Sequence, residues 1–312
     1  MRNAFAQAIT ELAIADDRIV LLSGDIGNRL FDDFKRRCPD RFYNCGVAEA
    51  NMIGVAAGLA MCGLRPVCYT IAPFITYRCI EQIRVDLCYH RLPVTIVGTG
   101  AGLAYASLGG THHSCEEVGM LRLLPEMTVL APADAMEVRA LLSATFDQQQ
   151  PTYMRIGKKG EPLVHSAPPA GLKLGQSIPM RTGKDLCLIV NGVLLPIALS
   201  VADRLESAGI AAEVLSFPTV KPLDEIALHR AFGSHTLVAT LEEHSVLGGF
   251  GGAVAEWLAD HPHPGTRLLR FGTPDVFYHD IGDQDEARDH FGLTPEAITA
   301  KLQSTLALAR SP

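Results

Sequence analysis

The sequence predicts an α/β fold built from two doubly wound units, and three observations support this. Short apolar or β-branched runs alternate with stretches whose apolar residues recur at helical spacing, which is typical of parallel sheets covered by helices on both faces. The alternation stops at a proline-containing segment and then resumes. The 312 residues, of which 48% are hydrophobic, are enough for two cores. We therefore expect domains at residues 1–165 and 175–312.

Each unit can be divided into strands, helices and a connecting segment. The expected strands are residues 18–22, 65–71, 93–97, 127–130 and 152–156, then 185–190, 212–216 and 236–241. The expected helices are residues 3–16, 49–62, 73–90 and 134–146, then 195–208 and 251–259. Asp134 is the expected N-cap of the helix that it begins. Residues 158–176 carry three prolines and no long apolar run, as expected of a linker.

Charge and composition argue against several classes of function. The net charge is −7 and no basic stripe with interleaved aromatic residues occurs, so we expect no nucleic-acid partner. No run reaches the roughly 18 apolar residues of a membrane span, and the N-terminus has the pattern of an amphipathic helix instead of a signal peptide. The eight cysteines form no C-x-x-C pair and are expected to be reduced thiols of a cytoplasmic protein.

Two glycine-rich segments match ligand-binding loops only in part. Residues 97–102 (VGTGAG) follow an expected strand, but Leu103 stands where a dinucleotide fingerprint requires glycine. Residues 248–252 (GGFGG) open an expected helix, whose N-terminus could bind an anion. A close-packing turn is the simpler interpretation of that second segment.

Three further elements carry candidate chemistry. Glu49 begins the small-residue helix EANMIGVAAGLAMC, where a glutamate is ordinarily a partner of the helix dipole. Phe74 and Tyr77 lie three residues apart on an expected helix and would share a face, for which core packing is the simple interpretation. His112 and His113 lie in a glycine-bordered loop after a strand, where α/β proteins place ligands, although a surface pair is the alternative. Adjacent histidines without a third ligand nearby disfavour a metal site.

The ordered set of motifs resembles the transketolase family. N-x-G-V-x-E-x-x-M at residues 44–52 precedes the Phe-x-x-Tyr element, and G-x-T-H-H at 109–113 precedes A-P-A-D at 131–134. A C-terminal unit with LEEHSVLGGFG at 241–251 completes the order. The resemblance covers nearly the whole chain and implies the pyrimidine-binding and C-terminal domains of that family.

The resemblance also implies roles for the candidate residues. Glu49 would hold the pyrimidine N1′ of thiamine diphosphate, Phe74 would stack on the pyrimidine, and Tyr77 would pack beside it. His112, together with the adjacent His113, would contact sugar hydroxyls, and His112 would stabilise charge at oxygen. Glu49 and His112 are thus the expected catalytic residues. A two-carbon unit would pass from a ketose to an aldose, with carbanion chemistry supplied by the cofactor.

The family's diphosphate-binding domain carries a G-D-G…N segment that binds magnesium, and we find no such segment here. Residues 23–28 (SGDIGN) contain a Gly-Asp pair with different spacing. We therefore expect the C-terminal subunit of a split transketolase. An N-terminal partner subunit would supply the Mg²⁺ site, and an α2β2 heterotetramer is expected. No metal ligand is expected in this chain.

Two features of the sequence bear on the choice of substrate: three basic residues, and one loop that departs from the family pattern. Arg29, Arg155 and Lys158 are candidates to bind the phosphate of a sugar phosphate, with ordinary solvated charge as the alternative. The family's D-G-P-T-H loop, whose acid reads a sugar hydroxyl, corresponds to L-G-G-T-H here, with Leu108 in place of the acid. Because the loss of such a hydrogen bond changes substrate preference, we expect a modified, deoxy or branched sugar phosphate.

Three alternatives remain at this point. The β subunit of a 2-oxo-acid dehydrogenase-type decarboxylase has the same layout, although the G-x-T-H-H loop favours transketolase. The 1-deoxyxylulose-5-phosphate synthase type has a similar loop but is normally one long chain. A non-catalytic interaction subunit is the alternative of another class, and the joint presence of Glu49, Phe74 and His112 argues against it.

Overall fold

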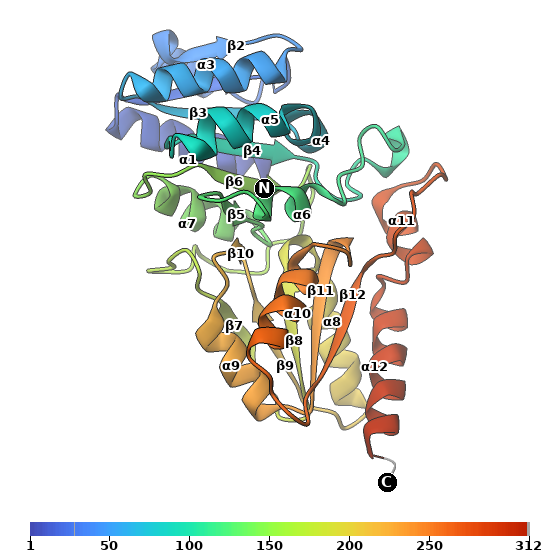
Figure 1. Ribbon diagram of the computed structural model, residues 1–312. Helices are drawn as coiled ribbons and strands as arrows, with labels where there is room; N and C mark the ends of the chain where they lie inside the picture. Colours follow the sequence, from blue (N-terminus) through green and yellow to red (C-terminus); the bar gives the residue numbers. More distant parts are fainter. Residues whose placement is uncertain (28, 311–312) are drawn as a thin grey trace.

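The computed structural model describes residues 1–27 and 29–310 and confirms the α/β prediction with two sheets (Figure 1). Asn28, which ends the SGDIGN segment, lies outside the described residues. The seven-stranded sheet has the order β10-β5-β6-β4-β3-β1-β2, and the five-stranded sheet has the order β12-β11-β8-β9-β7. Only the β10–β5 and β7–β9 pairs are antiparallel among the strands of the described ranges.

The strand bounds follow the apolar runs of the sequence closely. The first sheet contains β1 (Ile19–Ser23), β2 (Phe42–Asn44), β3 (Arg65–Ile71), β4 (Thr95–Thr99), β5 (Thr128–Leu130), β6 (Thr152–Ile156) and β10 (Thr219–Lys221). The second contains β7 (Ile178–Arg181), β8 (Leu186–Asn191), β9 (Ala212–Ser216), β11 (Leu237–Ser245) and β12 (Arg267–Thr273). Most strands are buried on both faces, as expected for parallel sheets covered by helices.

Helices cover both faces of the first sheet. One face packs against α1 (Arg2–Ala15), α2 (Asp32–Arg37) and α7 (Ala135–Thr145), and the other against α3 (Glu49–Met61) and α6 (Glu117–Arg122). Successive strand residues serve opposite faces, since Leu21 belongs to the cluster with α1 and Leu22 to the cluster with α3. This arrangement fixes the helix N-termini at the carboxyl edge of the sheet.

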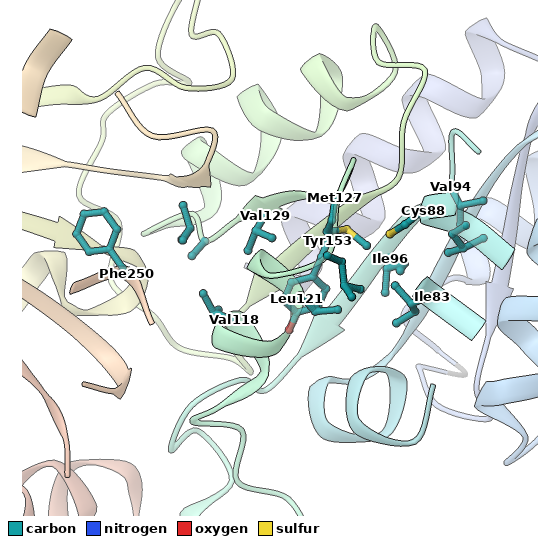
Figure 2. Packing of buried hydrophobic residues seen from close by; sticks show 14 of the residues in the cluster. Ile83, Cys88, Val94, Ile96, Val118, Leu121, Met127, Val129, Tyr153 and Phe250 are labelled. Carbon is teal, nitrogen blue, oxygen red and sulfur yellow. The ribbon is translucent and has the colours of Figure 1, made fainter. Parts of the chain in front are cut away.

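The two sheets share a continuous hydrophobic core. The cluster that contains Val118 and Leu121 of α6 also contains Phe250 of α10 (Phe250–Asp260), which comes from the second half of the chain (Figure 2). Strand β10 strengthens this connection because it follows β9 of the second sheet yet pairs with β5 of the first. The second half of the chain therefore helps to build the first sheet.

Helices also cover both faces of the second sheet. α8 (Leu195–Ser207) and α12 (Pro295–Arg310) pack on one face, and α12 runs along the outer side of the domain (Figure 1). α9 (Glu225–Ser234) and α10 pack on the other face, and α11 (Gln284–His290) precedes α12.

Most of the cysteines lie inside the protein. The eight cysteines are free thiols, and six of them are buried: Cys38, Cys68, Cys79, Cys88, Cys115 and Cys187. Among residues 1–27 and 29–310, no helix has the length and apolar content required to cross a bilayer.

Candidate functional site

The candidate site lies at the carboxyl edge of the first sheet, where ligands bind in open α/β sheets. Glu49 begins α3 after β2, and Phe74 and Arg78 follow β3. His112 lies in the loop after β4, and Lys158 follows β6. Because these strands are parallel, their carboxyl ends meet at one edge, and residues far apart in sequence can approach one another.

Glu49 is a buried carboxylate at the start of a helix. The residue is 2% exposed, and its N-cap, Ala48, has no side chain that could cap the helix. The N-terminal helix dipole favours a negative charge there. A buried charge also needs a direct partner, and Nη1 of Arg78 donates to Oε2 of Glu49 at 3.0 Å. Glu49 is therefore a buried acceptor whose visible partner is a half-exposed side chain.

Aromatic and cationic side chains continue from Glu49 across the sheet edge. The guanidinium carbon of Arg78 lies 4.6 Å from the centre of the Phe74 ring, and the Phe74 and His112 rings are 5.1 Å apart. His112 is 6.0 Å from the Tyr105 ring, and Nζ of Lys158 lies 4.8 Å from that ring. We call this set the Glu49 row; its members are Glu49, Arg78, Phe74, His112, Tyr105 and Lys158.

The helix expected at residues 73–90 changes its winding several times. It comprises α4 (Ala72–Thr76), a 3₁₀ turn (Tyr77–Cys79), α5 (Ile80–Gln82) and a π-helical stretch (Ile83–Tyr89). The Thr76 hydroxyl donates to the Ala72 carbonyl at 2.7 Å, a bond that bends helices. Phe74 consequently meets Arg78 and His112, whereas Tyr77 has a different partner.

Tyr77 joins the segment after β3 to the start of α6. Its hydroxyl donates to Oε2 of Glu116 at 2.5 Å. Burial, together with the nearby Glu117 and Glu116 carboxylates, raises the pKa of Tyr77, so the phenol remains a neutral donor. The structure thus places Tyr77 beside the Glu49 row as a support for the histidine loop.

The two adjacent histidines have different surroundings. His112 is half-buried and faces Phe74, and burial followed by the neighbouring His113 lowers the pKa of His112. His113 is buried, with Nε2 at 3.3 Å from the Ala106 carbonyl and its ring 5.8 Å from Tyr278. Only His112 belongs to the Glu49 row, where its neutral ring can exchange hydrogen bonds with a ligand.

Arg155 occupies a position that differs from the expected one. It is 5% exposed, its Nε donates to Oε1 of Glu117 at 2.5 Å, and Nη2 donates to the carbonyls of Ser114 and Glu243. This burial favours a structural role over the expected contact with a substrate phosphate. Arg29 is exposed in the turn after β1, and it stays a candidate on the same edge of the sheet.

Sequence reasoning missed Arg78, Tyr105 and Glu116. Arg78 stands four residues after Phe74, a spacing that places two side chains on one helix face, so its position offered a usable signal. Tyr105 and Glu116 flank the histidine loop without a motif of their own, and only the fold shows their proximity to His112 and Tyr77.

The glycine-rich segments serve close packing. Gly100 has φ +70°, and a Cβ there would lie 1.8 Å from the Tyr105 ring. At the second segment, the backbone N–H groups of Phe250 and Gly251 donate to the buried Glu242 carboxylate at 2.6 and 2.7 Å. The N-terminus of α10 therefore already holds an anionic group from its own chain, as expected of a packing turn.

Comparisons with known proteins identify the family. The transketolase pyrimidine-binding domain matches residues 1–161, and the transketolase C-terminal domain matches residues 175–298. The chain belongs to the transketolase family. A split-gene transketolase whose structure is described as an inactive β4 tetramer superimposes with a TM-score of 0.88 at 36% identity, over 99% of this chain and 98% of that one.

Named members of the transketolase family align over nearly the whole chain. A subunit of the apulose-4-phosphate transketolase of Phocaeicola vulgatus is 34% identical, covering 95% of this chain and 94% of that protein. The 6-deoxy-6-sulfo-D-fructose transketolase subunit SqwH of Clostridium sp. is 36% identical, covering 96% and 92%. The prediction of a C-terminal transketolase subunit is confirmed for family, fold and enzyme class.

Proposed function

We propose that this chain, assembled with an N-terminal subunit, transfers a two-carbon ketol unit from a ketose or ketose phosphate to an aldose or aldose phosphate. The reaction would use thiamine diphosphate, with Mg²⁺ held mainly by the partner, in a cytoplasmic α2β2 heterotetramer. The assembly of this chain with an N-terminal subunit is supported by the names of the relatives, which are transketolase subunits or come from a split gene. The single observation that carries the site assignment is the contact of buried Glu49 with a planar cation that lies over Phe74.

The positions of Glu49 and Phe74 around the Arg78 guanidinium suit an aminopyrimidine. The Arg78 guanidinium is planar, donates an N–H to the Glu49 carboxylate and lies over the Phe74 ring. A protonated aminopyrimidine has the same three properties, so the guanidinium is a stand-in for it. Arg78 is about half exposed and can withdraw toward solvent, whereas Glu49 and Phe74 are fixed by α3 and α4.

We assign the following roles to the residues of this chain. Thiamine diphosphate supplies the carbanion chemistry when it is bound. Glu49 would hold a proton at its carboxylate for the pyrimidine N1′, in surroundings dry enough to strengthen that hydrogen bond. Phe74 orients the ring by stacking. His112 bonds sugar hydroxyls in its neutral form and stabilises charge that develops at oxygen.

The substrate is proposed to differ from the unmodified sugar phosphates of the usual reaction. Leu108, where the family pattern has an acid, is 52% exposed and offers an apolar surface next to the histidine loop. A site without that acid no longer selects for the hydroxyl that the acid would bond. Two relatives are named for apulose 4-phosphate and for a 6-deoxy-6-sulfo sugar. Lys158 and Arg29 are the remaining candidates for the phosphate or another anionic end.

The site assignment is tested by Glu49→Gln in the reconstituted two-subunit enzyme. An amide cannot hold the proton at N1′, so turnover should fall by about 100-fold or more. Glu206→Gln, which alters an exposed carboxylate on α8, is the matched control and should retain full activity. Near-normal turnover of Glu49→Gln, in protein with an unchanged circular dichroism spectrum, would overturn the assignment.

The partner is tested by affinity capture of the tagged chain from its native lysate. A stoichiometric partner that carries the G-D-G…N segment supports the split enzyme, and the captured complex is then assayed with modified and unmodified sugar phosphates. Recovery of an active enzyme composed of this chain alone would contradict the proposal. Preference for xylulose 5-phosphate with ribose 5-phosphate would contradict the substrate part of it.

A further inference from the structure

A second cluster of polar side chains lies in the other sheet and has no part in the proposed transfer reaction. Cys187 is the second residue of β8, and Glu213 is the second residue of β9. The two are direct neighbours in the parallel register of these strands, so their side chains share one face of the sheet. His235, which caps the C-terminus of α9, lies over the same face.

The three side chains bring their donor atoms to one point inside the domain. The Cys187 sulfur, a Glu213 carboxylate oxygen and a His235 ring nitrogen all lie within 4.8 Å of one another. Oε2 of Glu213 is 3.6 Å from Nε2 of His235. Two ligands that bind one zinc ion at about 2.1 Å in a tetrahedron are roughly 3.4 Å apart, so this separation is close to a metal-bound one.

Burial makes the cluster different from an ordinary group of surface acids. Cys187 is fully buried, and Glu213 and His235 are each 7% exposed. Oε1 of Glu213 accepts from Nη1 of Arg230 at 2.6 Å. Oε2 has no hydrogen-bond partner within the part of the chain that the structure describes, although its side chain is 9% exposed. A buried carboxylate oxygen without a partner is costly and calls for an explanation.

The environment of His235 suits a metal ligand. Nδ1 lies 3.1 Å from the Ala231 carbonyl and can donate its proton there. Nε2, the nitrogen nearer to Glu213, then carries a free lone pair, as in metal sites where a carbonyl fixes the histidine tautomer. Nε2 is also 3.4 Å from the Gly183 carbonyl, an acceptor, so a bound ion would replace the long hydrogen bond that a protonated Nε2 makes there.

We propose that Cys187, Glu213 and His235 bind a divalent transition-metal ion, for which Zn²⁺ is the best fit. One sulfur, one nitrogen and one oxygen donor suit zinc, with the fourth tetrahedral position left for a water molecule, whereas magnesium and calcium require oxygen ligands. The ion would occupy the side of Glu213 opposite Arg230. It would connect β8 and β9 to the end of α9, and its role would be structural because the cluster is enclosed.

The alternative is a hydrogen-bonded cluster without a metal. In that case the Cys187 thiol would face Oε2 of Glu213 directly, and Arg230 would balance the charge of the carboxylate. The two interpretations differ in metal content and in the spectrum of a cobalt derivative, because cobalt bound by a thiolate in a tetrahedral site absorbs in the visible and shows a sulfur-to-metal band. Both readouts are independent of transketolase activity.

The experiment uses the full chain, loaded with Zn²⁺, dialysed and analysed by mass spectrometry for metal. Wild type should hold about one zinc per chain, and Co²⁺ should give the thiolate band. Cys187→Ser and Glu213→Gln should each weaken binding by at least about tenfold, with unchanged circular dichroism. His263→Gln is the control for adventitious surface binding, since His263 pairs with the exposed His229 at 3.3 Å. The His263→Gln variant should keep both the bound zinc and the cobalt–thiolate band.

Three results would overturn the proposal. The first is wild-type protein that retains no metal after loading. The second is metal content that is the same in Cys187→Ser and Glu213→Gln as in wild type. The third is loss of the metal in His263→Gln, which would move the binding to the surface histidines. Because Glu213→Gln preserves size and shape, it keeps the test valid if Cys187→Ser fails to fold.

Discussion

At the residue scale, the most informative contact is the one between Glu49 and Arg78. Arg78 satisfies a buried carboxylate and at the same time covers the ring of Phe74. A ligand that needs both Glu49 and Phe74 must displace the guanidinium first. Arg78 therefore acts as an internal competitor for the cofactor ring if the proposed function is correct.

The displacement leads to a prediction for Arg78→Met in the assembled enzyme. Thiamine diphosphate should associate about 1.4- to fivefold faster, because the ion pair of roughly 0.2–1 kcal/mol that the half-exposed Arg78 makes with Glu49 no longer has to be broken. Stopped-flow quenching of protein fluorescence measures the association rate. Arg84→Met, which alters an exposed arginine of the π-helical stretch, should leave the rate unchanged. Slower association of the Arg78 variant would mean that Arg78 itself contacts the cofactor.

At the element scale, α7 anchors the linker between the two predicted domains. Asp134 caps α7 with Oδ1, which accepts from the N–H groups of Met136 and Glu137, and its Oδ2 accepts from those of Val164 and His165. Nε2 of His165 is 2.9 Å from Oε1 of Glu137. The linker at residues 158–176, for which the sequence predicts no helix or strand, is thus attached to the N-terminus of α7 at several points.

This attachment should make stability depend on pH. The hydrogen bond to Glu137 raises the pKa of His165, so the stabilisation is fully present below the unfolded pKa of about 6.5 and is lost as pH rises through the higher folded pKa. Urea unfolding should show a larger cost of His165→Gln at about pH 5.5 than at about pH 8.5. The exposed His279 provides the control His279→Gln. If His165→Gln lowered the free energy of unfolding equally at both pH values, the ion pair between His165 and Glu137 would be contradicted.

At the scale of the whole molecule, buried charges join the two halves of the chain. Arg155 at the end of β6 pairs with Glu117 of α6 and also donates to the Glu243 carbonyl on β11. The Glu243 carboxylate in turn accepts from the backbone N–H of Leu103 at 2.9 Å and from Nε of Arg288 at 2.6 Å. The histidine loop is consequently held between both domains.

Removal of the central arginine should be costly. Arg155→Gln leaves the Glu117 charge buried without its partner, so the free energy of unfolding should fall by about 3–5 kcal/mol in urea titrations. Arg181→Gln breaks exposed pairs with Asp203 and Glu206 and should cost at most about 1 kcal/mol. If Arg155→Gln left the stability unchanged and raised the KM for a sugar phosphate, the result would instead support the expectation that Arg155 binds the substrate phosphate.

Much of the framework could be predicted from local sequence. The predicted bounds of β3, β6 and β9 coincide with the observed ones, and Asp134 is the N-cap of α7. The short elements α2, β2, α6, β7, β10 and α11 escaped prediction. The longer α9, β12 and α12 were also missed, although Ile298, Leu302 and Leu306 of α12 recur at helical spacing and are buried. Apolar runs and caps depend on neighbours within a few residues, so they are legible in one sequence. Each motif that marks the transketolase family is likewise a short segment, and the order of the motifs can be read along the chain without knowledge of the fold.

The tertiary structure alone decided which of these pieces meet. It paired β10 with the first sheet, buried Arg155 against Glu117 and brought Cys187 beside Glu213 and His235. It also brought Arg78, four residues after Phe74 on the same segment, beside Glu49 on another helix. Each of these outcomes joins residues on separate elements. Periodicity and helix propensity describe single elements, whereas such contacts arise only when sheets and helices close around a shared core.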